Sequence, residues 1–151
     1  APPTRSGSIS SSMERTPSIP EAYARVVQRS DACEFARLLG MAVTEIEGGR
    51  VRVAMPAEGT KNVHGTTHGG AIFSLADHAF GIAANMEGID QIAISARIRY
   101  FTVPAADTLE AVARRVSETE RTSVYAVDVF SGDRLVASFE GVGFKIGTVP
   151  G

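Results

Sequence analysis

Hydrophobic and polar residues alternate with a period of two in several segments of this chain. Two short segments, Ala42–Glu47 and Arg50–Met55, flank the pair Gly48-Gly49, and a glycine pair in this position is typical of a β-hairpin. The second half of the chain holds four longer segments of the same kind, namely Gln91–Val103, Thr108–Thr119, Thr122–Phe130 and Arg134–Ile146. The pattern therefore predicts a hairpin followed later by a run of four strands.

Helical periodicity begins near the N-terminus, in Glu21–Leu39. Within it, the segment from Asp31 to Glu34 resembles a capping box, and Gly40 follows as a stop signal. Residues 1–19 are rich in Ser and Pro and have no periodicity, so we expect a disordered N-terminal extension there.

A second helix is predicted over Gly70–Met86, and it is apolar on nearly every side, as a buried helix is. Its few polar residues fall on one stripe, which consists of Ser74, Asp77, His78 and Asn85. Asp77 lies too deep in the helix to serve as its cap. A buried carboxylate is costly unless it is solvated, paired or used, so the stripe indicates a functional site.

The order of these elements is a hairpin, a buried helix and four strands. Clustered strands favour an α+β fold, in which one antiparallel β-sheet wraps around a central long α-helix. A length of 151 residues fits one domain, which we place at residues 20–147.

The buried helix begins at a loop that reads His68-Gly69-Gly70. Glycine allows a ligand to approach the main chain closely, and the first turn of a helix has unpaired N–H groups at its positive dipole end. This combination suits a carbonyl oxygen that gains negative charge during a reaction.

Asn62, His68-Gly69-Gly70 and Leu75-Ala76-Asp77 together resemble the motif of the PaaI-type hotdog thioesterases, a family of small acyl-CoA thioesterases. The resemblance covers nearly the whole predicted domain. It implies a hotdog fold and hydrolysis of an acyl-CoA thioester to a free acid and coenzyme A. It also implies a homodimer or homotetramer with active sites at the subunit interface, and no cofactor beyond the coenzyme A of the substrate.

The resemblance also implies roles for single residues. The Gly69 N–H would polarise the thioester carbonyl, His68 would position the loop, and Asn62 would hold the substrate or the attacking water. Asp77 would be the general base or nucleophile, and Ser95 would orient the water. Asp77 and Ser95 of one subunit would face Asn62 and Gly69 of the other.

Further residues are predicted to bind the substrate. Gly70 belongs to the same turn, Asn85 to the polar stripe, and Phe73 is one of several apolar residues, with Phe80, Met86 and Tyr100, that would line an acyl pocket. Arginine pairs well with phosphate, so the phosphates of coenzyme A are expected to meet Arg97, Arg99 or Arg121, with Arg114 and Arg115 as further candidates.

Structural interpretations stand beside these roles. Asp77 would pair with a basic residue at a dimer interface, His68 would orient its loop rather than act as a base, and Asn62 would only form a turn. Ser95 would be an ordinary strand residue, and Asn85 would close the end of the helix. Two other functions also stay open: a hotdog dehydratase or hydratase acting on thioester-bound acyl chains, and a non-catalytic acyl-CoA binding module.

Composition excludes other classes. The net charge is −2, so no global positive field would attract nucleic acid or an anionic membrane. Cys33 is the only cysteine, so neither an internal disulfide nor a cysteine-based zinc site is possible, and the spacing of the histidines supplies no convincing metal ligand set. No segment is apolar enough for a membrane span, and we expect a cytoplasmic protein.

Overall fold

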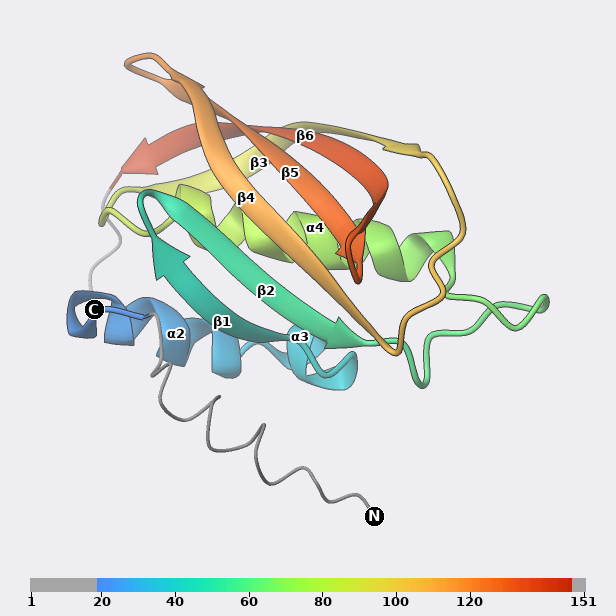
Figure 1. Cartoon of the computed structure of the whole chain (residues 1–151). Coiled ribbons are helices and arrows are strands. Elements are labelled where there is room, and N and C mark those ends of the chain that lie inside the picture. The colour runs from blue at the N-terminus through green and yellow to red at the C-terminus, as the bar shows by residue number, and fades with distance from the viewer. Residues whose placement is uncertain (1–18, 148–151) are drawn as a thin grey trace.

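The computed structural model describes residues 19–147, which form a curved antiparallel sheet around one long helix (Figure 1). The elements are, in chain order, η1 (Glu21–Tyr23), α2 (Ala24–Asp31), α3 (Glu34–Leu38), β1 (Ala42–Glu47), β2 (Arg50–Pro56), α4 (Gly69–Ala84), β3 (Asp90–Tyr100), β4 (Thr108–Glu118), β5 (Thr122–Ser131) and β6 (Arg134–Gly147). The predicted α+β class and the hotdog architecture are confirmed. The predicted extension lies outside the described residues except for Ile19, which is partly buried against the core.

The strands of the sheet are arranged in the order β1-β2-β4-β5-β6-β3, and each neighbouring pair is antiparallel. The turn between β1 and β2 is formed by Gly48 and Gly49, both with positive φ, as a tight hairpin requires. After α4 the chain crosses to the far edge, where β3 pairs only with β6 among the described strands. The β3 ladder has an irregularity at Ala93–Ser95, so Ile94 is an extra residue at a bulge.

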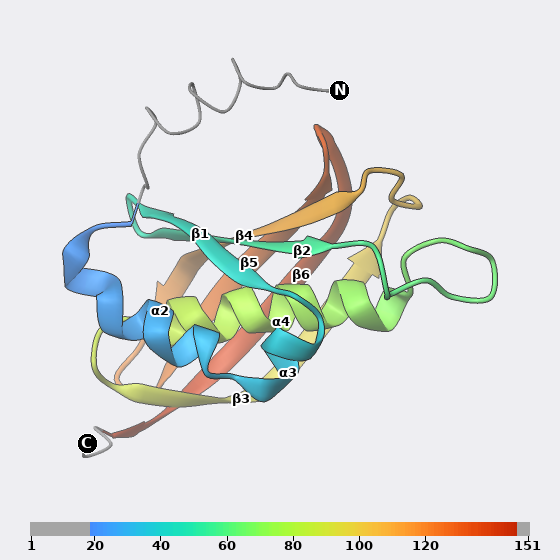
Figure 2. The same ribbon diagram turned by 90° about the horizontal axis from the view of Figure 1, so that it is seen from below.

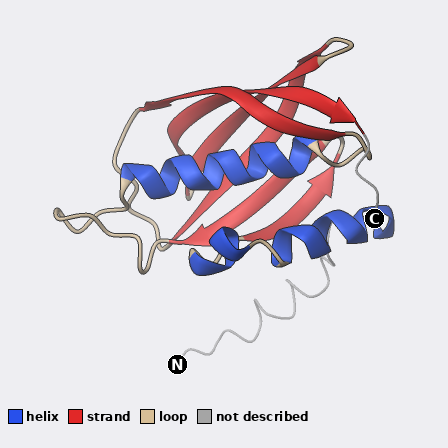
Figure 3. Cartoon of the chain, turned by 180° about the vertical axis from the view of Figure 1, so that it is seen from behind, coloured by secondary structure: helices blue, strands red, loops and turns tan. Residues whose placement is uncertain are grey.

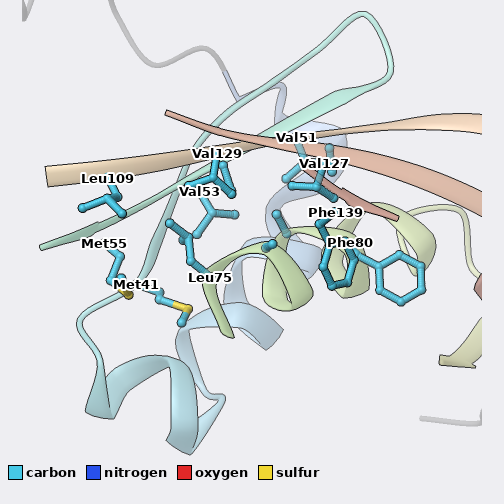
Figure 4. Close-up of a cluster of buried hydrophobic side chains, with 14 of the residues drawn as sticks. Met41, Val51, Val53, Met55, Leu75, Phe80, Leu109, Val127, Val129 and Phe139 are labelled. Atoms are coloured by element: carbon cyan, nitrogen blue, oxygen red, sulfur yellow. The ribbon is translucent and has the colours of Figure 1, made fainter. Parts of the chain in front are cut away.

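The core lies between α4 and the concave face of the sheet. Leu75, Ala76 and Ala79 of α4 are completely buried, and the small side chains let the helix approach the strands closely. Figure 4 shows Leu75 and Phe80 of α4 among buried side chains of β2, β4, β5 and β6. Gly141 of β6 makes room for Phe80, because a Cβ at that position would come within 2.9 Å of the ring.

The N-terminal helical region differs from the prediction, since the single helix expected over Glu21–Leu39 is broken into η1, α2 and α3. The expected capping box does not form, because Cys33 occupies the N-cap of α3 without a side-chain bond. Ser30 and Ala36 are both buried, yet residues six apart on one straight helix point about 120° away from each other. The break allows both residues to face the body of the protein.

Helices α2 and α3 lie alongside α4 on the side that the sheet leaves open (Figures 2 and 3). Arg29 of α2 is 3.7 Å from Asp90 at the start of β3. The side chain of Ser30 is 2.8 Å from Nε2 of His78 in α4. These contacts hold α2 against the C-terminal half of α4.

Candidate active site

The first turn of α4 is organised by His68. This residue is the N-cap, and its Nδ1 accepts a hydrogen bond of 2.8 Å from the Gly70 N–H. The ring lies so close that a Cβ on Gly70 would come within 3.0 Å of Nδ1. The His68 carbonyl accepts the N–H groups of Ala71 and Ile72. Through these bonds His68 orients the loop.

Gly69 has the first N–H of the helix, and this group donates to no atom of residues 19–147. Its carbonyl oxygen accepts a hydrogen bond of 2.9 Å from the hydroxyl of Tyr100. The Tyr100 ring lies 3.4 Å from the position of a Cβ on Gly69, so the close approach of β3 favours glycine here. Local sequence patterns contain no signal for this contact, because Tyr100 is 31 residues away.

Asn62 builds the loop that precedes the helix. Its side-chain oxygen accepts from the His64 N–H at 2.9 Å, and from both the N–H and the hydroxyl of Thr66 at 3.1 and 3.2 Å. The His68 N–H, in turn, donates to the Thr60 carbonyl. The loop is thus fixed at both ends, and its exposed tip includes Val63, which is 96% exposed.

Asp77 lies on the polar stripe of α4 and is half-buried. It has no hydrogen bond or ion pair with the described part of its own chain. Burial raises the pKa of its carboxyl above the ordinary value of 3.8. A partly desolvated carboxylate without a partner is available for chemistry or for a group from another molecule.

His78, the next residue, has a different role. Its Nε2 is hydrogen-bonded to Ser30, and burial lowers the pKa of the ring below its ordinary 6.5, so the imidazole is neutral at pH 7. Between residues 19 and 147 no group of three His, Cys, Asp or Glu side chains is placed to hold a metal ion.

The predicted site residues of one chain lie far apart from one another. Gly69 and Asp77 are eight residues apart on one helix, which corresponds to about 12 Å along its axis. A single thioester carbonyl and its attacking water do not span that distance. Ser95 lies on β3, where its side chain is exposed and forms no hydrogen bond with residues 19–147.

Three residues predicted to line the acyl pocket or bind the substrate have structural contacts within the chain. Phe73 packs edge to face on Phe139, with ring centroids 5.3 Å apart, and Phe80 packs on the same ring. The side chain of Asn85 closes α4: its amide nitrogen donates to the Gly81 carbonyl and its oxygen accepts from the Gln91 N–H, both at 2.8 Å. Phe73 and Phe80 thus pack against the core, and their contact with the acyl group stays a prediction.

The predicted arginines are not gathered at one place. Arg97 and Arg99 line a shallow cavity of about 300 Å³ on the sheet, where Arg97 pairs with Glu140 at 3.2 Å. Arg121 lies in the turn between β4 and β5, and its carbonyl accepts from the Lys145 N–H. Lys145 in turn pairs with Gln91 of β3. Gln91 and Arg97 are six residues apart on that strand, so Arg121 and Arg97 are separated by about 20 Å along the sheet.

Comparisons with known proteins fit this geometry. A sequence profile of the thioesterase superfamily matches residues 64–138. The acyl-coenzyme A thioesterase PaaI of Escherichia coli strain K12 is 33% identical over 127 residues, which cover 82% of this chain and 89% of the relative. The chain belongs to the PaaI-type thioesterases.

Solved structures agree with this assignment. The structure of the E. coli PaaI protein from the phenylacetic acid degradation operon superposes with a TM-score of 0.78 at 29% identity, covering 85% of this chain and 96% of that one. A mutant of the phenylacetic acid degradation protein PaaI from Thermus thermophilus superposes with a TM-score of 0.71 at 37% identity, covering 76% of this chain and 100% of that one.

Membership of the PaaI-type family confirms the resemblance stated from the motif, the hotdog fold and the reaction class of thioester hydrolysis. The roles of Asp77, Gly69, His68, Asn62 and Ser95 stay predictions. Within residues 19–147, no helix is both long and apolar enough to cross a membrane.

Proposed function

We propose that this protein hydrolyses an acyl-CoA thioester to a free acid and coenzyme A, in active sites that two subunits share. The observation that supports this proposal most directly is the separation of two groups along α4. The Gly69 N–H and the Asp77 carboxylate each have no hydrogen-bond partner among residues 19–147, and they lie about 12 Å apart in one chain. A partner copy that places its Asp77 opposite Gly69 would bring the two groups to one thioester.

The surface of β3 supports a homodimer, by itself or paired into a homotetramer. This edge strand exposes Ile92 and Ile94, and the residues Ile89 and Phe101 that flank it are exposed as well, which is more apolar surface than a soluble monomer would present. A second copy paired along β3 would cover them. The neighbouring Val63 loop would then reach the partner subunit.

The proposed reaction begins when the Gly69 N–H, at the positive end of α4, donates to the carbonyl oxygen of the thioester. Asp77 of the partner accepts a proton from water as the water oxygen bonds to the carbonyl carbon, the carbon–sulfur bond then breaks, and the sulfur of coenzyme A receives a proton. In the alternative, the Asp77 carboxylate attacks this carbon itself and the carbon–sulfur bond breaks, so that the thiolate of coenzyme A leaves and takes up a proton. Water then hydrolyses the acyl–Asp77 anhydride to the free acid and restores the carboxylate. The mechanism needs no metal and no organic cofactor.

The other residues would act around this centre. His68 holds the Gly69-Gly70 turn through the hydrogen bond that its Nδ1 accepts from the Gly70 N–H. Asn62 fixes the loop and would contact the substrate or the water, and Ser95 of the exposed edge strand would orient the water. His68 Nδ1 is already occupied by the Gly70 N–H, which disfavours the histidine base that a hotdog dehydratase needs.

The direct test is release of free thiol from a panel of acyl-CoA thioesters by the purified protein. We expect steady turnover of at least one thioester without added metal. A change in enoyl absorbance without thiol release would indicate a dehydratase or hydratase instead. Binding of acyl-CoA with neither signal would indicate a non-catalytic module.

We also propose that a phosphate of coenzyme A meets Arg97 or Arg99, or else Arg121. Arg99 has no ion pair with any residue that the structure describes, whereas Arg97 is paired with Glu140. Arg99→Ala is therefore expected to raise KM severalfold with little change in kcat, because it removes binding that the ground state and the transition state share. Steady-state kinetics with Arg37→Ala as control, an exposed arginine on α3, would check this result. An unchanged KM in the Ala variants at positions 97, 99 and 121 would remove the proposal.

A further inference from the structure

A small cavity lies between α2 and the C-terminal half of α4. Its volume is about 170 Å³, and its walls include Val26, Ser30 and Cys33 on one side and His78, Gly81 and Ile82 on the other. No residue predicted to carry out the chemistry lines it. It nevertheless begins next to Asp77, because Gly81 lies one helical turn further along the same face of α4.

Gly81 is what leaves this wall open. Glycine in the middle of a helix is less favourable than alanine, and packing within residues 19–147 does not require it. A Cβ added at Gly81 would meet no atom of these residues within 4 Å, in contrast to Gly141, where it would meet Phe80. Within the described chain, the missing side chain therefore enlarges the cavity at some cost in helix stability.

The cavity is also bounded at its far end. Asn85 lines it there, and the hydrogen bonds of its side chain to Gly81 and Gln91 hold it in place. From His78 to Asn85 the helix advances about 10 Å. An apolar cavity of about 150 Å³ is known to accept benzene, so this one has room for a compact group of about that size.

The polar atoms in the walls do not favour a charged ligand. Ser30 and His78 are hydrogen-bonded to each other, Ser30 is only 2% exposed, and burial keeps His78 neutral at pH 7. Arg29 also lines the cavity, but its guanidinium pairs with Asp90 at 3.7 Å. Val26, Ile82 and Cys33 add apolar side chains to the walls. The contents are therefore expected to be uncharged and largely apolar.

We propose that Gly81 determines the acyl specificity of the enzyme, because its missing side chain opens this cavity to the acyl group of the thioester. The group that fits is compact and uncharged, a branched chain or a single ring, and long linear chains are stopped by Asn85. This inference rests on the proposed thioesterase function, with the cavity in the subunit that supplies Asp77.

The test compares wild type, Gly81→Ala and Gly81→Leu by thiol release from acetyl-, isovaleryl-, phenylacetyl- and dodecanoyl-CoA. For wild type we expect the compact isovaleryl or phenylacetyl thioester to be preferred over the dodecanoyl one. Gly81→Leu fills the cavity and is expected to lower kcat/KM for the compact thioesters about 10-fold or more. Acetyl-CoA, whose methyl group stops short of the cavity, should change less than about threefold, the order of a small packing effect.

Gly81→Ala serves as the matched control, since it removes the glycine but fills little of the space. Both variants favour the helix more than glycine does, so their thermal midpoints are expected to equal or exceed that of wild type. Three results for Gly81→Leu would overturn the assignment of the cavity. These are an equal loss of kcat/KM for all four thioesters, an unchanged order of kcat/KM among them, and a change of oligomeric state. If wild type releases no thiol from any thioester, the proposed function itself fails, and the two failures are thus distinguishable.

Discussion

Replacement of Asp77 by asparagine is expected to lower kcat about 100-fold or more, the scale of losing a general base. Asparagine is nearly the same size and still forms hydrogen bonds, but it cannot accept the proton of water or attack as a strong nucleophile. Folding, assembly and acyl-CoA binding should therefore be kept. Thiol-release kinetics and the thermal midpoint, measured on one preparation, test both parts of this prediction.

A purely structural role for Asp77 predicts the opposite pattern. If the carboxylate served to pair with a basic residue of a partner subunit, Asp77→Asn would weaken the dimer or lower its stability. Turnover per folded dimer would then stay close to that of wild type. Such a result would falsify the catalytic assignment and direct attention to His68 or to a non-enzymatic role.

The pH dependence of stability gives an independent measurement on the same variant. Burial raises the pKa of Asp77 above the 3.8 of an ordinary carboxyl, so the folded chain holds this proton more tightly than the unfolded chain does. The stabilising contribution is therefore complete below pH 3.8 and is lost as the pH rises through the raised value. Asp77→Asn, which has no charge to bury, is expected to match or exceed the thermal midpoint of wild type at pH 7. At pH 3 this advantage should be absent.

The second large effect is expected from Ile94→Lys. Ile94 is 56% exposed at the bulge of the edge strand β3 and takes no part in the ladder with β6. A lysine here would leave the fold of the subunit intact but place a charge where a second copy is proposed to pair. We expect a folded monomer in light scattering at micromolar protein. We also expect at least a roughly 100-fold loss of activity, because Gly69 and Asp77 of one chain cannot act on one thioester.

Val116→Lys is the matched control for this variant. Val116 is an exposed apolar residue of β4, 53% exposed, on a strand in the interior of the sheet order. It should remain oligomeric and active. A monomeric wild type, or an Ile94→Lys monomer with full activity, would show that the site is complete in one subunit.

Local patterns were sufficient for most of the secondary structure. The alternation in the strands, the glycine pair at residues 48–49 and the apolar helix each depend on residues a few positions apart, and the observed elements agree with the predictions to within a few residues at most ends. The exception is Glu21–Leu39. Its helical pattern was correct, but the need to bury both Ser30 and Ala36 against distant elements breaks the helix.

For the candidate site, too, some features follow from the sequence and others only from the tertiary structure. The sequence by itself determined that a carboxylate, Asp77, lies on a buried helix that begins at a glycine turn, because both features follow from spacing along one helix. Only the tertiary structure decided that Tyr100 packs on Gly69, that Ser30 is hydrogen-bonded to His78, and that Phe73 packs against the core. It also decided that β3, far from β1 in the sheet, forms an exposed edge. Such contacts join residues that are many positions apart, and they depend on how whole elements pack rather than on the preferences of neighbouring residues.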